Sequence, residues 1–536
     1  IASSDKKHIT SEEIAQAAKL IGLDFTEAER ALMAENVNNS LAGYEEVRTV
    51  RLDNSVPPAV SFDPGYSRKP GPVSQPADRH IQLSDVPDLE LPADLEALAF
   101  YPTTHLAQLL RNQQVSSLAL TEMYLQRLKR FGPKLECVVT LTEELALSQA
   151  RRADEEIAAG NYRGPLHGIP WGAKDLLATR GFPTTWGAMP YKDQVIDVDA
   201  TVVQRLEEAG AVLVAKLTLG ALAWGDVWFG GKTRNPWNLE EGSSGSSAGS
   251  ASAVAAGLVG FTIGTETHGS IVSPSTKCGA SGLRPTFGRV SRHGAMALSW
   301  TMDKIGPICR SVEDCAVVFN AIHGADPMDR TAVTQPFQWD PAGIDLSSLR
   351  IGYIRSAFEE ERDNKAFDDE TINVLRALGA NLVPVELPDY PMQMLSLFYR
   401  AEAAAAFDEL TRSGRDELLV RQVKDAWPNV FRAARLIPAV EYIQANRLRT
   451  LLMQGMADLM SQVDLYIAPS FSDTLLLTNL TGHPAVVVPN GFSAEGIPAS
   501  SITFIGDIYG EATTLAVAKM YQDATDFHLR RPAMNW

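Results

Sequence analysis

Residues 242–250 read Gly-Ser-Ser-Gly-Ser-Ser-Ala-Gly-Ser, and a strongly apolar run over residues 253–261 follows almost at once. A flexible glycine–serine linker would have polar flanks, so this context favours serines that are packed rather than solvated. Small residues beside a buried element let backbones approach closely and let N–H groups point inward, as a site that stabilises an oxyanion requires. A second pair, Gly269 and Ser270, comes soon afterwards. Together the two stretches predict a catalytic centre.

Length and composition indicate a large globular protein. With 536 residues, 45% of them hydrophobic, the chain can bury a large core, and we expect one catalytic domain with an extension. The net charge of -17 argues against direct binding of nucleic acid, because phosphates are neutralised by clustered lysines and arginines. A nucleic-acid partner would need the help of another chain.

The cysteines give no sign of a metal site, because they form no C-x-x-C pair and have no histidine at a metal-binding spacing. We expect free and mostly buried thiols, and neither a metal nor a cofactor. The cysteines are Cys137, Cys278, Cys309 and Cys315.

No apolar run is long enough to span a membrane, and the first residues do not resemble a signal peptide. The chain starts with Ile1 rather than Met, which we interpret as the loss of a preceding segment. We therefore expect a soluble protein that is either cytoplasmic or exported with its leader already removed.

The N-terminal part reads as helices followed by an extended arm. Thr10-x-x-Glu13 and Thr26-x-x-Glu29 are capping-box patterns that open two helices. Residues 54–92 are rich in proline and lack periodicity, which favours an arm wrapped on the main body over a linker. We predict an N-terminal helical extension and arm over residues 1–95 and a catalytic domain over residues 96–536.

The rest of the chain alternates between helical and strand patterns. Helical spacing covers residues 104–131 and 143–159, and β-rich runs cover 211–215, 349–354, 381–385, 465–468 and 485–488. This alternation predicts an α/β protein with one central sheet covered by helices on both faces. Residues 325–460 are predicted to form a helical insertion, which either roofs a pocket or packs as ordinary surface helices.

Residues 245–249 also match G-x-S-x-G, the nucleophile elbow of α/β-hydrolases, with Ser247 as the nucleophile. That motif follows a buried strand, whereas Pro236 and several charges precede it here, so the elbow is not favoured. Without an elbow, no histidine has a special claim to be a base, since a lone histidine is more often structural. The histidines concerned are His268, His293, His323 and His483.

Lys174 is a different candidate base. It follows an apolar, glycine-punctuated run over residues 164–173, where burial is expected. Burial lowers the pKa of a lysine because the cation loses its hydration, and the neutral amine can then accept a proton from a hydroxyl. Taken alone, such a lysine is more often a surface residue at the end of a strand.

With these stretches in view, the chain resembles the amidase signature family of Ser-Ser-Lys hydrolases from about Tyr101 to its end. Residues 164–175 resemble the lysine motif of the family, 245–258 its serine–glycine signature and 264–271 its nucleophile loop. Further matches cover residues 282–291, 303–307 and 479–484. The resemblance implies the amidase signature fold, with a mostly parallel or mixed twisted sheet.

By this resemblance, Ser270 is the nucleophile, Ser246 the bridging serine and Lys174 the base. Ser247 would support Lys174 by a hydrogen bond, and a cis peptide would join Gly245 to Ser246. The implied reaction is hydrolysis of an amide through an acyl-enzyme. The backbone N–H groups facing the oxyanion would be those of Thr267, His268, Gly269 and Ser270.

One part of the nucleophile loop departs from the family pattern Asp-x-Gly-Gly-Ser-x-Arg. Here Glu266 replaces the aspartate, His268 a glycine and Val272 the arginine. We therefore expect that the usual pairing of acid and arginine cannot form. Backbone donors do not depend on side-chain identity, so the hydrolytic assignment is unaffected.

The substrate is indicated only indirectly. Tryptophans near the motifs could line an apolar pocket, although core packing is the commoner role of this residue. The residues predicted to line the pocket are Trp171, Trp224 and Trp228, and Trp186 lies near them. We expect a small-molecule amide or aryl amide with an apolar acyl part, with esters and carbamates as secondary substrates, and a monomer or homodimer.

Two other functions stay open. The family includes glutamine-hydrolysing A subunits of tRNA-dependent amidotransferase complexes, which work only with partner proteins. The N-terminal extension and the altered nucleophile loop favour a stand-alone enzyme instead. A catalytically inactive binding protein is disfavoured, because all three relay positions are occupied.

Overall fold

The computed structural model describes residues 8–52, 56, 59–60 and 79–535, so most of the arm predicted over residues 54–92 lies outside the described part. The chain divides into two compact units. The first, here called the helical unit, comprises Ile1–Pro64, Ala297–Met302 and Pro388–Ala457. The second, the sheet unit, comprises Gly65–Met296, Asp303–Leu387 and Asp458–Trp536. The domain boundaries at residues 95 and 96 stay a prediction.

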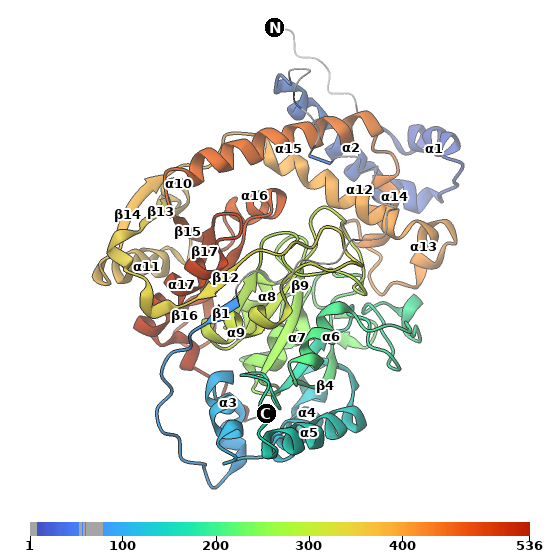
Figure 1. Ribbon diagram of the computed structural model, residues 1–536. Helices are drawn as coiled ribbons and strands as arrows, with labels where there is room; N and C mark the ends of the chain where they lie inside the picture. Colours follow the sequence, from blue (N-terminus) through green and yellow to red (C-terminus); the bar gives the residue numbers. More distant parts are fainter. Residues whose placement is uncertain (1–7, 53–55, 57–58, 61–78, 536) are drawn as a thin grey trace. The chain divides into compact units, whose positions relative to one another are not determined.

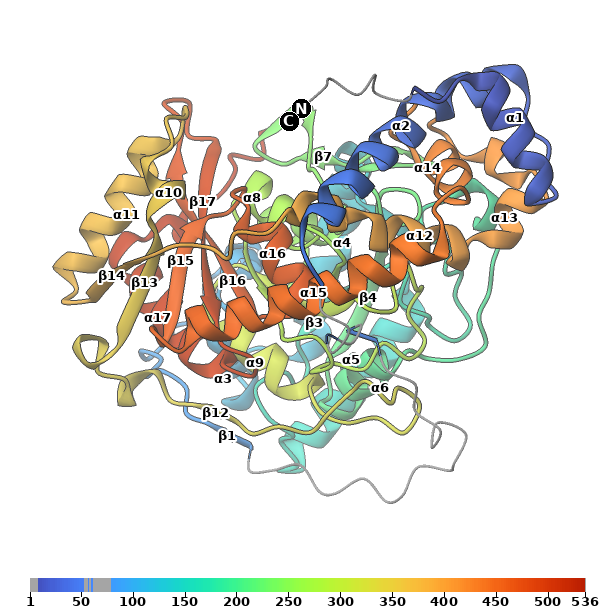
Figure 2. The ribbon, with the colours of Figure 1, turned by 90° about the horizontal axis from the view of Figure 1, so that it is seen from above.

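The helical unit begins with the two helices that the capping boxes predict. Helix α1 (Ser11–Leu20) and helix α2 (Glu27–Thr49) each start with a complete capping box, in which the threonine and the glutamate exchange hydrogen bonds. Ile14 of α1 and Met33 of α2 are fully buried and pack with Ala433. The remaining long helices of this unit are α12 (Leu397–Ala406), α14 (Trp427–Ala434) and α15 (Ala439–Met460), with the short α13 (Asp408–Arg412) between the first two (Figures 1 and 2).

The sheet unit is built on one sheet of 11 strands, in the order β14-β13-β15-β17-β16-β10-β11-β9-β3-β4-β2. Strands pair in parallel at β14-β13-β15 and at β9-β3-β4, and antiparallel elsewhere. The α/β class is therefore confirmed, and the sheet is mixed. The strands are β2 (Val138–Leu141), β3 (Pro170–Lys174), β4 (Val212–Leu217), β9 (Phe261–Glu266), β10 (Ser281–Arg284), β11 (Lys304–Cys309), β13 (Arg350–Ile354), β14 (Asn381–Val385), β15 (Leu465–Pro469), β16 (Ala485–Phe492) and β17 (Pro498–Gly506).

Three two-stranded sheets accompany it: β1 (Arg79–Ile81) with β12 (Phe337–Trp339), β5 (Val227–Trp228) with β6 (Gly231–Lys232), and β7 (Arg234–Asn235) with β8 (Asn238–Gly242). The helices of this unit are α3 (Thr103–Arg111), α4 (Ser117–Leu135), α5 (Glu143–Ala158), α6 (Thr201–Glu208), α7 (Ala248–Ala255), α8 (Val272–Cys278), α9 (Val312–Ile322), α10 (Arg355–Glu359), α11 (Lys365–Ala377), α16 (Thr474–Thr481) and α17 (Glu511–Thr525). Strands β3, β4, β11, β15 and β16 are buried along their whole length, because helices cover both faces of the sheet.

Two segments differ in detail from the prediction. The helical spacing over residues 104–131 belongs to two helices, since α3 ends at Arg111 and Ser116 caps α4 by accepting from the N–H of Ala119 at 3.0 Å. The segment 325–460 contains the strands β12, β13 and β14 as well as helices. In the described part of the chain, no helix is long and apolar enough to cross a membrane.

Helix α7 explains why glycine and serine precede an apolar run. Every residue of this helix is buried, and Val254 and its neighbours belong to a hydrophobic cluster that includes Val212, Val214 and Leu217 of β4. The backbone of Gly249 lies directly against β4, with its N–H donating to the carbonyl of Thr218 at 2.9 Å. A Cβ atom at Gly249 would lie 2.5 Å from the carbonyl oxygen of Cys137 and from the amide nitrogen of Thr218.

We therefore expect Gly249→Ala to destabilise the protein by about 1–3 kcal/mol or more, because the clash is with backbone atoms that cannot rotate away. Thermal unfolding followed by circular dichroism measures the effect. Ala255→Gly in the same helix is the control, because it changes helix propensity by about 1 kcal/mol without a clash. An unfolding temperature for Gly249→Ala equal to that of the native protein would show that α7 does not pack as closely as described.

Candidate active site

Lys174, the last residue of β3, is completely buried with its amine at the centre of a set of oxygen atoms. Its Nζ lies 2.9 Å from Ser246 Oγ, 3.0 Å from Ser247 Oγ and 2.8 Å from Thr265 Oγ1. Strand β3 pairs with β9, which supplies Thr265, and both serines lie at the start of α7. The structure thus brings the lysine and the serine–glycine stretch together, 72 residues apart in the chain.

The surroundings of Ser247 determine how protons can be arranged around the amine. Ser247 Oγ donates to the carbonyl of Thr265 at 3.0 Å, and it accepts from the N–H of Thr265 at 3.1 Å. A serine hydroxyl has one proton, so towards Lys174 this oxygen can only accept. A neutral amine has two N–H donors and one lone pair. When Ser247 and Thr265 accept its two protons, the lone pair is available to the hydroxyl of Ser246.

Burial lowers the pKa of Lys174 well below the usual 10.5, because the ammonium loses its hydration, while Asp303 and Glu266 act in the opposite direction. The second fully buried lysine, Lys216, offers a comparison. Its Nζ forms an ion pair with Asp175 at 3.0 Å, which partly offsets the lowering of its pKa by burial. Within the described residues, no carboxylate oxygen lies within ion-pair distance of Lys174. Of the two lysines, only Lys174 is therefore arranged to give up its proton.

The predicted nucleophile, Ser270, lies in the loop between β9 and α8 and is 8% exposed. The N–H of Ser247 donates to the carbonyl of Ser270 at 3.2 Å, which fixes this loop beside the start of α7. The peptide bond between Gly245 and Ser246 is cis, as the resemblance implied. Among the described residues, the hydroxyls of Ser246 and Ser270 share no hydrogen bond. Catalytic hydrogen bonds often tighten only when substrate is bound.

The predicted oxyanion donors lie in the same loop. Gly269 has a φ of +82°, and in the described structure the N–H groups of Gly269 and Ser270 have no protein acceptor. The hydroxyl of Thr267 donates to Asp303 at 2.6 Å. His268 is exposed, but the protein around it still excludes enough water to lower its pKa, with Glu266 acting in the opposite direction. Two unoccupied backbone donors beside Ser270 are what an oxyanion site requires.

The usual pairing of the acid with an arginine at position 272 is absent, because this residue is Val272, but an arginine from another strand takes its place. Glu266 and Arg284, both fully buried, form an ion pair at 2.8 Å. The arginine comes from the end of β10 instead of from position 272, and the glutamate is one methylene longer than the aspartate of the family pattern. Arg284 lies in the stretch 282–291 that resembles the family. The spacing of residues within the nucleophile loop could not show that the partner of Glu266 comes from another strand.

The carboxylate of Glu266 is the anchor of the nucleophile loop. Its Oε2 accepts from the backbone N–H groups of Ile271 and Val272 at 2.8 and 3.0 Å. Its Oε1 accepts from Arg284 and from Asn479 Nδ2, each at 2.8 Å. Burial raises the pKa of Glu266, but Arg284 and the other donors outweigh it and lower the pKa to about 2. Asn479 and Thr265 are residues whose roles were not predicted.

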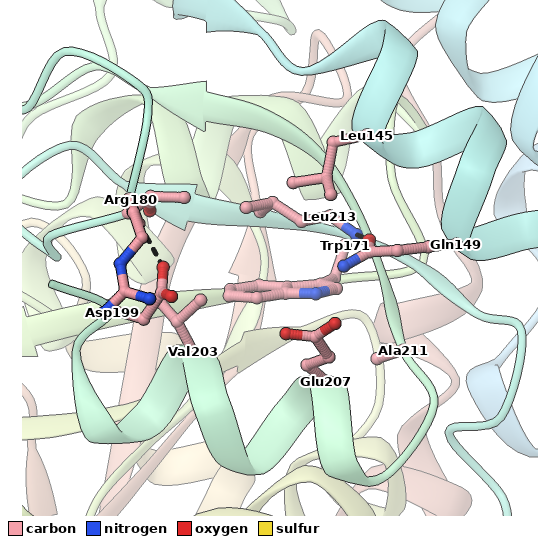
Figure 3. Close-up of a pocket in the computed structure, with 10 residues that line it drawn as sticks. Leu145, Gln149, Trp171, Arg180, Asp199, Val203, Glu207, Ala211 and Leu213 are labelled. Atoms are coloured by element: carbon pink, nitrogen blue, oxygen red, sulfur yellow. Dashed lines mark hydrogen bonds between the residues drawn. The ribbon is translucent and has the colours of Figure 1, made fainter. Parts of the chain in front are cut away.

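Of the tryptophans predicted to line the substrate pocket, only Trp171 lines the cavity shown in Figure 3. Trp171 stacks on Phe261 and lines a cavity of about 210 Å³ with Gln149 and Glu207 (Figure 3). None of the three predicted relay residues, all of which the structure describes, lines that cavity. Core packing and a separate cavity therefore account for Trp171.

Trp224 and Trp228 lie closer to the serine–glycine stretch. Between them, the carbonyl of Gly225 is so near to Gly245 that a Cβ atom there would come within 1.8 Å of it. Asp226 Oδ2 accepts from the N–H of Ser244 at 3.1 Å. Trp228 is buried with its ring against Phe229. This segment borders the site, and its contact with substrate stays a prediction.

Two other histidines, His323 and His483, have surroundings that indicate a structural role. His483 pairs with the hydroxyl of Thr481 at 2.8 Å, and burial lowers its pKa to about 4. His323 is buried and packs on Phe319 and Phe337. In the described structure the hydroxyl of Ser247, the nucleophile of the rejected elbow, has Lys174 and Thr265 as its partners and no histidine.

The Glu266 network predicts a specific sensitivity to acid. Its folded pKa of about 2 lies below the ordinary 4.5, so its stabilisation is complete above the ordinary value and is lost as the pH falls towards 2. Glu266→Gln should lower the unfolding temperature at pH 6, by about 3–5 kcal/mol in stability, because Arg284 stays buried without its partner. The same variant should show a shallower further loss between pH 6 and pH 3.

Unfolding temperatures measured across this pH range test the prediction. Glu122→Gln, at an exposed position of α4, is the matched control and should behave as the native protein. An acid profile of Glu266→Gln as steep as that of the native protein would contradict the assigned role.

Comparison with known proteins agrees with this geometry. A family model described as Amidase matches residues 119–475. The A subunit of glutamyl-tRNA(Gln) amidotransferase from Geobacter metallireducens is 35% identical over 470 residues, which are 79% of this chain and 96% of that protein. The corresponding protein from Chloroflexus aurantiacus is 38% identical over 467 residues, 78% of this chain and 96% of that protein.

Solved structures give a similar picture. Peptide amidase from Stenotrophomonas maltophilia superimposes with a TM-score of 0.73 and 30% identity, covering 82% of this chain and all of that one. A bacterial aryl acylamidase of the amidase signature family, at 24% identity, a TM-score of 0.72 and coverage of 81% and 99%, supports the fold. The chain therefore belongs to the amidase signature family and is a hydrolase that acts on carbon–nitrogen bonds.

Proposed function

We propose that this protein hydrolyses a small-molecule carboxamide through an acyl-enzyme on Ser270, with Ser246 and Lys174 as the proton relay. The observation that carries the proposal is the buried amine of Lys174, which has no carboxylate partner in the described structure and lies 2.9 Å from Ser246 Oγ. Burial lowers the pKa of such an amine, which favours its neutral form as a base, and its neighbour is a hydroxyl.

In the acylation step, the lone pair of Lys174 takes the proton of Ser246, whose oxygen takes the proton of Ser270. The oxygen of Ser270 then attacks the amide carbonyl and forms a tetrahedral oxyanion. The N–H groups of Gly269 and Ser270 are placed to donate to this oxyanion, and the loss of one such donor typically costs about 3–4 kcal/mol. When the C–N bond breaks, the proton returns through Ser246 to the leaving amine.

The deacylation step uses the same groups in reverse order. Water gives a proton through Ser246 to Lys174 and attacks the ester carbonyl of the acyl-enzyme. Collapse of the second tetrahedral intermediate breaks the bond to Ser270, which regains its proton from the relay. The hydrogen bonds that the amine donates to Thr265 and Ser247 hold it in one position through both steps.

The proposed substrate is an amide or aryl amide with an apolar acyl part. The similarity to peptide amidase over the whole of that chain supports a stand-alone amidase. The segment with Trp224 and Trp228, which borders Gly245, supplies aromatic side chains for an apolar group. Esters and carbamates present the same electrophilic carbonyl and are secondary candidates. No nucleic acid, cofactor or membrane takes part in this proposal, in which the protein acts as a monomer or homodimer.

A second candidate is hydrolysis of glutamine inside a complex, which the similarity to these amidotransferase proteins favours. They align with less than four-fifths of this chain, although almost all of their own length is covered. His268 also narrows the choice, because an imidazole at a loop position where the family has glycine changes the space beside Ser270. The loop favours the stand-alone amidase, whereas the matched share of this chain does not distinguish the two candidates, since peptide amidase covers 82% of it.

A fluorophosphonate probe tests the nucleophile. We expect it to label Ser270, with labelling abolished in Ser270→Ala and slowed by about 10³-fold or more in Lys174→Ala, as in other catalytic units. Intact-protein and peptide mass spectrometry measure the adduct. Ser244→Ala is the control, because Ser244 bonds to Ser273 and has no contact with Lys174 in the described structure. Label on Ser247 instead would restore the nucleophile elbow.

The pH dependence of labelling tests the base. Since neutral Lys174 is the active form, the rate should rise with pH and level off with a midpoint well below the ordinary lysine value of 10.5. In Lys174→Ala this rise of the labelling rate with pH should disappear. A midpoint at or above 10 in the native protein would exclude Lys174 as the base at neutral pH.

The substrate is tested with the purified chain alone on anilides, primary amides, carbamates and glutamine. We expect the highest kcat/KM for an amide with an apolar acyl group and no release of ammonia from glutamine. Turnover of glutamine in preference to the other compounds would favour the amidotransferase function, and Ser270→Ala controls for contaminating activity.

A further inference from the structure

The helical unit contains a pocket of its own, of about 660 Å³. Its walls come from α12, α14, the start of α15 and the loop that carries Trp300 and Thr301. The volume falls within the range of about 300–1,000 Å³ that small-molecule sites occupy. All of its lining residues belong to the helical unit, and none is part of the proposed relay.

The walls of this pocket are largely apolar and are made of short side chains. Five alanines line it, and their methyl groups leave the space between the helices open. Trp300, which is 49% exposed, adds a large aromatic surface. An aromatic ring that keeps half of its surface in water gains free energy when a ligand covers it. The alanines are Ala401, Ala404, Ala405, Ala434 and Ala439.

A buried network holds the Trp300 wall in position. Glu402, 6% exposed, accepts from the N–H and the hydroxyl of Thr301 at 3.1 and 2.8 Å. Its remaining acceptor positions are used by Ser299 Oγ at 2.7 Å and by the hydroxyl of Tyr442 at 2.9 Å. Arg449 donates to the carbonyl of Thr301 at 2.9 Å. The segment before and after Trp300 is therefore tied to α12 and α15, and the pocket is formed without a ligand.

The two carboxylates at the pocket already have their hydrogen-bond donors, which limits the ligand. Glu402 has four donors, and an ionised carboxylate offers about four acceptor positions. Asp408 accepts from Arg435 Nη2 at 2.5 Å and from Arg412 Nε at 2.6 Å. A cation would have to displace one of these donors, and an anion would lose its hydration beside the two carboxylates, so either charge costs more free energy than it returns.

We propose that this pocket binds an uncharged, largely apolar small molecule of aromatic character, packed between the alanine wall and Trp300. The site lies within the helical unit and does not depend on the proposed catalytic function. Affinity comes from the burial of apolar surface, and the two carboxylates, which already have their donors, select against ions.

A pair of fluorescent probes with the same ring system tests this proposal on the full chain. N-phenyl-1-naphthylamine is uncharged, and 1-anilinonaphthalene-8-sulfonate carries one negative charge. We expect the uncharged probe to bind at one saturable site with a Kd at least about tenfold lower than that of the sulfonate. Equal affinities, or tighter binding of the sulfonate, would overturn the charge argument.

Two variants and a control locate the site. Ala405→Trp, at an exposed position of the wall, fills the pocket, and Trp300→Ala removes the aromatic surface. Each should raise the Kd of the uncharged probe by about tenfold or more, which is 1.4 kcal/mol. Ala31→Trp, at an exposed position of α2 outside the pocket, should change the Kd of the uncharged probe by less than about twofold.

Unchanged binding in both pocket variants, or an equal loss in Ala31→Trp, would overturn the proposal. Thermal unfolding of each variant confirms that the helical unit is folded. Probe binding is also measured in Ser270→Ala, where it should be unchanged; a loss there would place the probe at the catalytic centre instead.

Discussion

The proposed chemistry depends on one constraint, which is that an amine is buried among hydroxyls and carbonyls without a carboxylate partner. A buried ammonium is costly, and a protein usually offsets this cost with an ion pair, as it does for Lys216 with Asp175. Lys174 has only neutral oxygen neighbours at hydrogen-bond distance in the described structure. Its proton is therefore weakly held, and its surroundings orient the lone pair towards one serine. The sheet and the close approach of α7 place those neighbours.

Much of this arrangement could be predicted from the sequence because its signals are local. The apolar run after residues 242–250 indicated a buried helix, and the β-rich runs identified strands that do lie in the central sheet. The contact between Lys174 and Ser246 could be predicted because both lie in stretches that resemble motifs of the family. The mixed order of the sheet could not be derived from periodicity, since strand direction is set by connections that alternate between helices and hairpins.

The contacts that the sequence did not reveal lie where two distant segments meet. The acid–arginine pair was thought absent because position 272 holds valine, yet Arg284 reaches Glu266 from the neighbouring part of the sheet. Trp171 was assigned to a pocket with the other tryptophans because it is near Lys174 in sequence. Its side chain packs on Phe261 and lines a separate cavity. Spacing along the chain does not determine on which side of a strand a cavity opens.

The anchoring of the nucleophile loop by Glu266 has a consequence for the design of new selectivity. The carboxylate accepts hydrogen bonds from the backbone N–H groups of residues 271 and 272. The proposed donors to the oxyanion are also backbone groups. The exposed side chain at position 268 is therefore not what gives the loop its shape. A library that randomises this single codon, with Glu266 and Arg284 kept intact, would explore substrate preference while leaving the catalytic scaffold in place.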